Sequence, residues 1–176
     1  MESAENSKRK VGIMGIIFPL IALVLTAVTV ALTFLTGKLS YSASGYSTSF
    51  TINGSFFTFS GNGVSYSWFS SNTPSHFTSN MILVALVFLV LAIVMYLVQL
   101  VFNIVKGSKS GKISTLLPVL GIVFSIITIV TFYIGFDHLG SKISGSGLSF
   151  SAYPAAGMYV LIVGIIFGII SIFLKD

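Results

Sequence analysis

The sequence is poor in charge and has no cysteine. Only 7% of its 176 residues are Asp, Glu, Lys or Arg, whereas about a quarter is usual in soluble domains. So few charges cannot cover the surface of a soluble domain, and the chain is expected to be a membrane protein of one domain. The absence of Cys excludes disulfides, zinc–thiolate sites, iron–sulfur clusters and cysteine nucleophiles.

Four apolar segments are long enough to cross a bilayer, whose core of about 30 Å needs a helix of about 20 residues. None of them contains Asp, Glu, Lys, Arg or His. They are residues 11–36, 80–105, 113–136 and 154–174. The predicted fold is therefore an all-α bundle of four transmembrane helices.

Two residues are expected to mark helix starts, and two prolines are expected to bend helices. Asn80 can cap the second helix with its side-chain oxygen, and Pro154 suits the first turn of the fourth. Pro19 and Pro118 lie inside the first and third segments. Each removes a backbone hydrogen bond and should bend its helix.

The basic residues predict the orientation. Seven of the nine lie beside one set of segment ends: Lys8, Arg9, Lys10, Lys106, Lys109, Lys112 and Lys175. Only Lys38 and Lys142 lie on the other side. This asymmetry predicts cytoplasmic N- and C-termini in a cell (plasma) membrane. A lipid-headgroup or nucleic-acid patch is the less favoured interpretation of these cations, and we expect no nucleic-acid partner.

The first apolar segment could instead be a cleaved signal peptide. Its basic start fits that interpretation, but its apolar run exceeds the 7–15 residues of a typical signal core. We therefore expect a retained helix.

The two outer loops, residues 37–79 and 137–153, are predicted to form a small antiparallel sheet. Apolar residues alternate with Ser and Thr over 46–52 and 64–68, and an earlier strand over 39–43 is an open alternative. Asn53–Gly54 is a strong two-residue hairpin signal, after which 56–60 would return. Residues 61–63 would make a second turn.

The second outer loop ends in another alternating stretch, residues 148–152. A lone strand is unstable, so it is expected to pair with an edge of the first loop's sheet. The apolar face of this sheet would then lie on the outer ends of the helices. Asn53 also begins a glycosylation sequon, Asn53-Gly54-Ser55.

The predicted sheet region has almost no charge, and no Asp or Glu occurs between Lys38 and Ser79. One hypothesis is an acidic exterior, as at the surface of an acidophile, where carboxylates would lose their charge and hydroxyl groups would not. The alternative is burial of the sheet against neighbouring proteins.

Small residues form stripes on the third and fourth segments, which is typical of close helix packing in lipid. They are Gly121, Ser125, Gly157, Gly164, Gly168 and Ser171. The stripes could drive homo-oligomerisation, but packing within the same bundle is the favoured interpretation. Gln99 and Asn103 share one face near the cytoplasmic end. We expect headgroups or water to satisfy them, and a transport site is the alternative.

The absence of ionisable groups at membrane depth argues against proton relays, ion pumps and most coupled transporters. No ligand set for haem or copper is evident, so no cofactor is expected. His76, Asp137 and His138 all fall on the outer side and could form a metal site or a pH-sensitive clasp. The favoured interpretation is that they only end membrane spans.

The layout resembles the claudin and peripheral-myelin-protein group of tetraspan membrane proteins. That group's first loop carries a W…GLW…C…C signature, and this chain offers Val64-Ser-Tyr-Ser-Trp68-Phe69 in the corresponding loop, without the cysteines. The resemblance implies a structural or adhesive membrane protein, or a partner subunit.

The expected function is therefore non-catalytic: structural assembly in the membrane or cell-surface interaction. The expected partners are lipid and further membrane proteins, including copies of this chain. An accessory subunit of a respiratory or transport complex and a small pore or carrier for uncharged solutes are the alternatives. Aromatic residues concentrate in interfaces, so the expected contact residues are Tyr41, Tyr46, Tyr66, Trp68 and Phe69. The sheet's own core and an aromatic belt at the membrane surface are the alternative roles for them.

Overall fold

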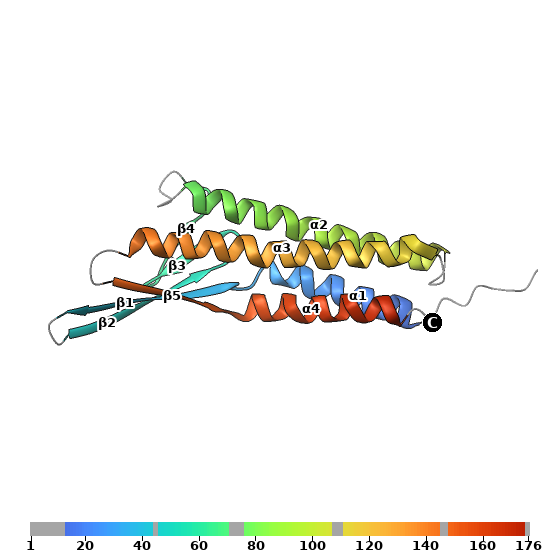
Figure 1. Ribbon diagram of the computed structural model, residues 1–176, viewed down its shortest axis with the longest axis horizontal. Helices are drawn as coiled ribbons and strands as arrows, with labels where there is room; N and C mark the ends of the chain where they lie inside the picture. The colour runs from blue at the N-terminus through green and yellow to red at the C-terminus, as the bar shows by residue number, and fades with distance from the viewer. Residues whose placement is uncertain (1–12, 44–45, 71–75, 107–110, 145–147, 175–176) are drawn as a thin grey trace, which may run out of the picture.

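The computed structural model describes residues 13–43, 46–70, 76–106, 111–144 and 148–174. It contains four helices packed together and one five-stranded antiparallel sheet at one end of the bundle (Figure 1). The helices are α1 (Met14–Thr29), α2 (His76–Lys106), α3 (Gly111–Ile143) and α4 (Ala156–Phe173). The strands are β1 (Leu35–Ala43), β2 (Tyr46–Gly54), β3 (Thr58–Gly61), β4 (Val64–Ser67) and β5 (Leu148–Pro154).

The helices form a ring in which each packs on two neighbours. α1 packs against α2 and α4, and α3 packs against α2 and α4. The start of α1 and the end of α4 lie together at the end opposite the sheet, where α2 also ends and α3 begins (Figure 1). Among the described residues, three helices, α2, α3 and α4, are long and apolar enough to cross a membrane.

Helix α1 is shorter than the predicted segment 11–36. It has 16 residues and rises about 24 Å. The chain leaves the helix because the backbone of Phe34 joins the sheet: its N–H donates to the Gly54 carbonyl at 2.7 Å, and its carbonyl accepts from Ala155 N–H at 3.1 Å. Hydropathy alone does not distinguish this buried extended segment from another helical turn.

The other predicted helix boundaries also need correction. α2 begins at His76, so Asn80 lies inside the helix and is not its cap. α3 continues to Ile143, because Leu139 and Gly140 prolong its buried face beyond residue 136. Pro154 ends β5 and does not open α4. The two predicted prolines, by contrast, do lie inside helices: Pro19 in α1 and Pro118 in α3.

The sheet has the order β4-β3-β2-β1-β5, with all neighbours antiparallel. The pairing of residues 148–152 with the first loop's sheet is confirmed, since β5 pairs with β1 from Leu148 to Pro154. The earlier strand is also confirmed, and it is longer than 39–43. β3 begins at Thr58, two residues later than predicted.

The predicted hairpin at Asn53–Gly54 is wrong. Both residues lie within β2, opposite Thr36 and Leu35 of β1. Gly54 is required for a different reason, because a Cβ there would lie 2.6 Å from the ring of Phe136 on α3. The second predicted turn is correct: Asn62 and Gly63 have φ values of 52° and 79° and join β3 to β4.

An aromatic cluster joins the sheet to the bundle. Phe34, Phe56 and Phe132 form a triangle with ring centroids 4.7–5.0 Å apart. Trp68 packs against Phe59 at 4.5 Å and against Phe136 at 6.5 Å. Phe136 in turn packs against Phe150 of β5 at 5.8 Å, and burial of so many rings holds the sheet firmly on the helices. Besides the triangle, the aromatic cluster includes Phe59, Trp68, Phe136 and Phe150.

Candidate functional site

The outer halves of β1 and β2 form an arm that projects past the helix ends (Figure 1). Cross-strand pairing puts Leu39, Phe50 and Phe150 in one row on one face. The opposite face carries a row of hydroxyl groups from Ser40, Ser49 and Ser149. Leu39 is buried, whereas Phe50 is 40% exposed, so in this row the apolar face is covered at β1 and open at the neighbouring strand β2.

One edge of the arm has no neighbouring strand in the described part of the chain. β3 pairs with β2 only at Ile52, Asn53 and Gly54, so Ser47–Thr51 lie beyond the end of that ladder. A groove of about 610 Å³ runs beside this edge, between β2 and the turn that joins β3 to β4. Its lining includes Ser49, Thr51 and Ser65 from the strands and Asn62 from the turn.

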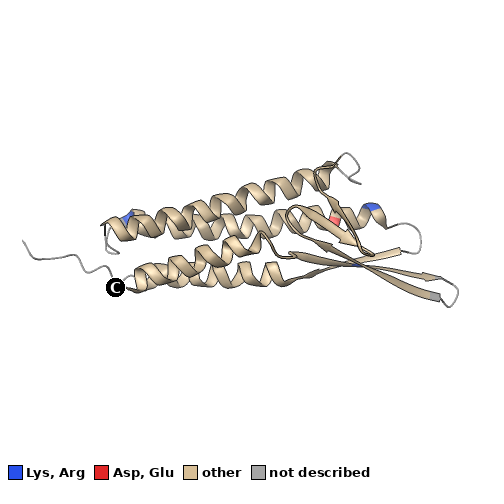
Figure 2. Cartoon of the chain, turned by 180° about the vertical axis from the view of Figure 1, so that it is seen from behind, with Lys and Arg blue, Asp and Glu red and all other residues tan. Residues whose placement is uncertain are grey.

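The arm and the rest of the sheet carry almost no charge. Lys38 is the one charged residue in the five strands, and it is exposed. In Figure 2 the helices of the described part of the chain are tan along most of their length, with the coloured acidic and basic positions near their ends. An unprotected strand edge normally carries charge, proline or a bulge to block pairing with another chain.

Some of the predicted contact residues are exposed, and one is buried. Tyr41, Tyr66 and Phe69 are exposed. Trp68 is fully buried, and its Nε1–H donates to the Ser55 carbonyl at 2.7 Å, so it belongs to the core and cannot make an outside contact. Tyr46 is the first residue of β2, and its side chain lies outside the described residues. The sequence did not mark Phe50 and Phe57, which are also exposed.

The predicted metal residues do not form a cluster. Asp137 and His138 lie within α3 and do not follow it. The ring of His138 packs on Phe77 with centroids 4.6 Å apart, while His76 and Asp137 are exposed. No group of three or more potential ligands that could hold a metal occurs among the residues the structure describes.

The predicted packing residues are all buried inside the bundle: Gly121, Ser125, Gly157, Gly164, Gly168 and Ser171. A Cβ on Gly168 would lie 2.6 Å from the Tyr96 hydroxyl, and one on Gly121 would lie 2.9 Å from the same ring. Gly164 faces Thr26 of α1, and a Cβ added to Gly164 would lie 3.3 Å from the Thr26 hydroxyl. These contacts support packing within one chain over homo-oligomerisation as the role of the stripes.

Gln99 and Asn103 are buried and hydrogen-bond to other helices, contrary to the expectation of headgroups or water, although Gln99 Oε1 has no hydrogen-bond partner among the described residues. Asn103 Nδ2 donates to the Gly15 carbonyl of α1 at 2.7 Å, and its Oδ1 accepts from the Ser114 hydroxyl of α3 at 3.2 Å. Gln99 Nε2 donates to the Ser171 hydroxyl of α4 at 3.2 Å. We call Gly15, Gln99, Asn103, Ser114 and Ser171 the polar clamp; it connects all four helices.

The polar clamp compensates for the backbone hydrogen bond that Pro19 removes from α1. Proline has no N–H for the carbonyl one turn earlier, which is that of Gly15. The amide of Asn103 supplies the missing donor. From the sequence, Pro19 leaves the Gly15 carbonyl without its helical donor, and Asn103 carries an amide within an apolar segment. The sequence does not give the helix register that brings the carbonyl and the amide together.

Asn53, the sequon residue, is exposed on the hydroxyl face of the sheet. Its side-chain oxygen accepts from the Thr36 hydroxyl at 3.1 Å. Glycosylation of Asn53 stays a prediction.

Comparison with models of known protein families and with curated proteins finds no match to this chain. The likeness to claudins is accordingly one of layout alone: four helices, three of them long and apolar, and a five-stranded sheet whose first four strands lie between α1 and α2. The chain contains none of the cysteines of that group's signature.

Proposed function

We propose that this chain is a non-catalytic, multi-pass membrane protein whose sheet makes lateral or cell-surface contacts with other membrane proteins, including copies of itself. The helices would cross the cell membrane, with both chain ends in the cytoplasm and the sheet outside. This placement is supported by the apolar surface of α2, α3 and α4. The excess of basic residues that the sequence places beside the opposite set of segment ends favours the proposed orientation.

Helix α1 fits this placement although it is about one turn short of a 30 Å core. Backbone polar groups need internal partners within lipid. After α1 ends, turn bonds satisfy the N–H groups of Val30, Ala31 and Leu32, and the Thr33 carbonyl accepts from Gly157 N–H at 2.7 Å. The segment between α1 and β1 is therefore hydrogen-bonded within the protein.

The observation that carries the proposal is the projecting arm with its uncharged free edge and adjoining groove. Strand addition to such an edge gives affinity through main-chain hydrogen bonds, and side-chain contacts give specificity. The exposed ring of Phe50 lies on β2, the strand that would receive a partner, and the exposed rings of Tyr41 and Tyr66 lie on β1 and β4 of the same sheet. A carrier for uncharged solutes is less favoured, because Tyr96 fills the space between Gly121 and Gly168 in the bundle core.

Site-specific photo-crosslinking in native membranes tests this function. A photoreactive phenylalanine analogue replaces Phe50 on the arm or, as a control, Phe173 at the opposite end of the bundle; both are exposed. We expect a discrete adduct from position 50 and a much weaker one from position 173. An adduct of twice 18.8 kDa would be the self-complex, and a cofactor-bearing partner would indicate an accessory subunit. Absence of any adduct at position 50, or equal adducts from both ends, would contradict the proposal.

A further inference from the structure

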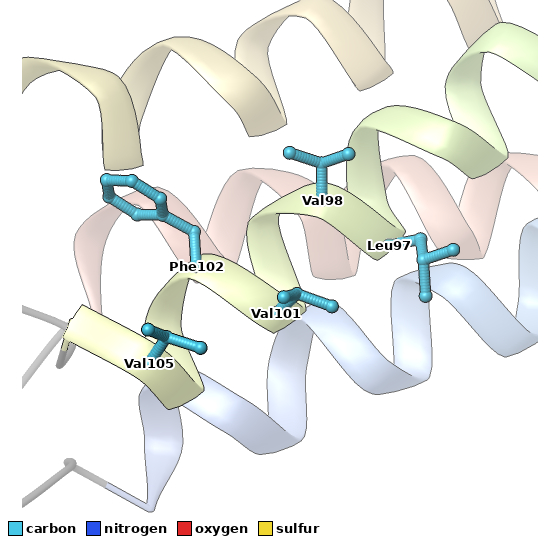
Figure 3. A pocket seen from close by; sticks show the side chains of 5 residues that line it. All are labelled: Leu97, Val98, Val101, Phe102 and Val105. Carbon is cyan, nitrogen blue, oxygen red and sulfur yellow. The ribbon is translucent and has the colours of Figure 1, made fainter.

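A second surface feature lies at the other end of the molecule, on α2. It is an apolar groove of about 340 Å³ lined by Leu97, Val98, Val101, Phe102 and Val105. All five side chains project from α2, and Val98 and Phe102 lie on the side towards α3 (Figure 3). We call it the α2 groove.

The length of the α2 groove matches one leaflet of a bilayer. From Leu97 to Val105 the helix rises about 12 Å, and half of a hydrocarbon core of about 30 Å is about 15 Å. An extended acyl chain lying along α2 would therefore run the length of the groove and place its headgroup just beyond Val105.

Two lysines lie near this end of the groove in the sequence. Lys106 follows Val105 directly and ends α2, and Lys112 is exposed in the first turn of α3. Asp137 is the one acidic residue in the described segments, and it lies near the sheet end of α3. Lysines at the end of an apolar helix surface attract anionic lipid headgroups, with an expected effect of about fivefold in affinity for each lysine.

We propose that the α2 groove, together with Lys106 and Lys112, is a binding site for an anionic phospholipid. The acyl chain would lie against Leu97, Val101 and Val105, and the phosphate would lie at the end of α2, which Lys106 terminates and after which Lys112 follows in the first turn of α3. This inference rests on the proposed placement of the bundle in a membrane.

Quenching by brominated lipids tests the site, with Val101→Trp as reporter and Val90→Trp as matched control. Val101 and Val90 are 51% and 49% exposed, and eleven residues, or about three helical turns, separate them on one face of α2. The only native tryptophan, Trp68, is buried at the sheet end, so the parent protein gives the background signal. The vesicles contain phosphatidylcholine and phosphatidylglycerol, with bromine on the acyl chains of one or the other.

We expect phosphatidylglycerol to quench position 101 with at least about fivefold higher relative affinity than position 90. The double variant K106Q/K112Q should bring position 101 close to the control. Equal preference at the two positions, or a preference that survives the double variant, would overturn the proposal. Quenching at position 90 but not at 101 would also overturn it, because protein would then cover the groove. No quenching at either position would contradict the membrane placement itself.

Discussion

At the scale of single residues, one tyrosine determines how closely three helices approach. Tyr96 of α2 is fully buried and lies between Gly121 of α3 and Gly168 of α4. A small-residue stripe in lipid usually lets two backbones meet. Here part of the stripe admits a large side chain instead, which the sequence could not reveal because it depends on the register between helices.

We predict that Gly168→Ala destabilises the protein by about 1–3 kcal/mol, because the new methyl group would overlap the Tyr96 hydroxyl in a closed core. The measurement is thermal unfolding in detergent. Tyr96→Phe removes the nearest atom, so it should recover much of the loss in the double variant. Gly164→Ala is the graded control and should cost less, since its methyl would meet Thr26 at 3.3 Å instead of 2.6 Å. A Gly168→Ala protein as stable as the parent would contradict this packing.

The polar clamp yields a second prediction at the residue scale. Asn103→Leu should cost about 1–2 kcal/mol, because the Gly15 carbonyl and the Ser114 hydroxyl lose a partner in a buried site. Pro19→Ala restores a backbone donor to Gly15, so the Asn103→Leu penalty should be smaller in that background. A double-mutant cycle measures this coupling. Strictly additive effects would mean that Asn103 does not compensate for Pro19.

At the scale of elements, the sequence predicted the strands better than their connections. Alternating apolar and hydroxyl residues placed β2, β4 and β5 correctly, because a sheet with one covered face imposes a period of two. The turn predicted at Asn53–Gly54 is wrong, although Asn-Gly favours a turn locally. Gly54 lies in the strand because its close contact with Phe136 leaves no room for a side chain. The end of α1 was missed because the backbone bonds of Phe34 to Gly54 of β2 and to Ala155, which precedes α4, are a tertiary effect.

The composition of the sheet predicts resistance to acid. None of the five strands contains Asp or Glu, so no carboxylate there is protonated as the pH falls through about 4. We expect the β component of the circular dichroism or infrared spectrum to be the same at pH 3 and pH 7. Loss of that component at pH 3 would count against the acidic-exterior hypothesis and leave burial against neighbours as the reason for the missing charge.

At the scale of the whole molecule, hydropathy predicted four helices, and alternating residues in the two loops predicted a sheet at one end. They did not predict which side chains would meet: the aromatic cluster, the polar clamp and the free edge of β2 all arise from contacts between distant segments. The candidate contact surface was therefore predicted in part. Tyr41, Tyr66 and Phe69 are exposed as a contact surface requires, whereas Trp68 is part of the core.

The placement of the two ends on opposite sides of a membrane can be measured directly, since the parent chain has no cysteine. Ser49→Cys puts one thiol on the exposed arm, and Lys112→Cys puts one at the other end of the bundle. With a membrane-impermeant maleimide on intact cells, we predict that the Ser49→Cys protein is labelled at once and the Lys112→Cys protein only after permeabilisation. Labelling of both variants in intact cells, or of Lys112→Cys alone, would contradict the membrane-spanning bundle with its sheet outside.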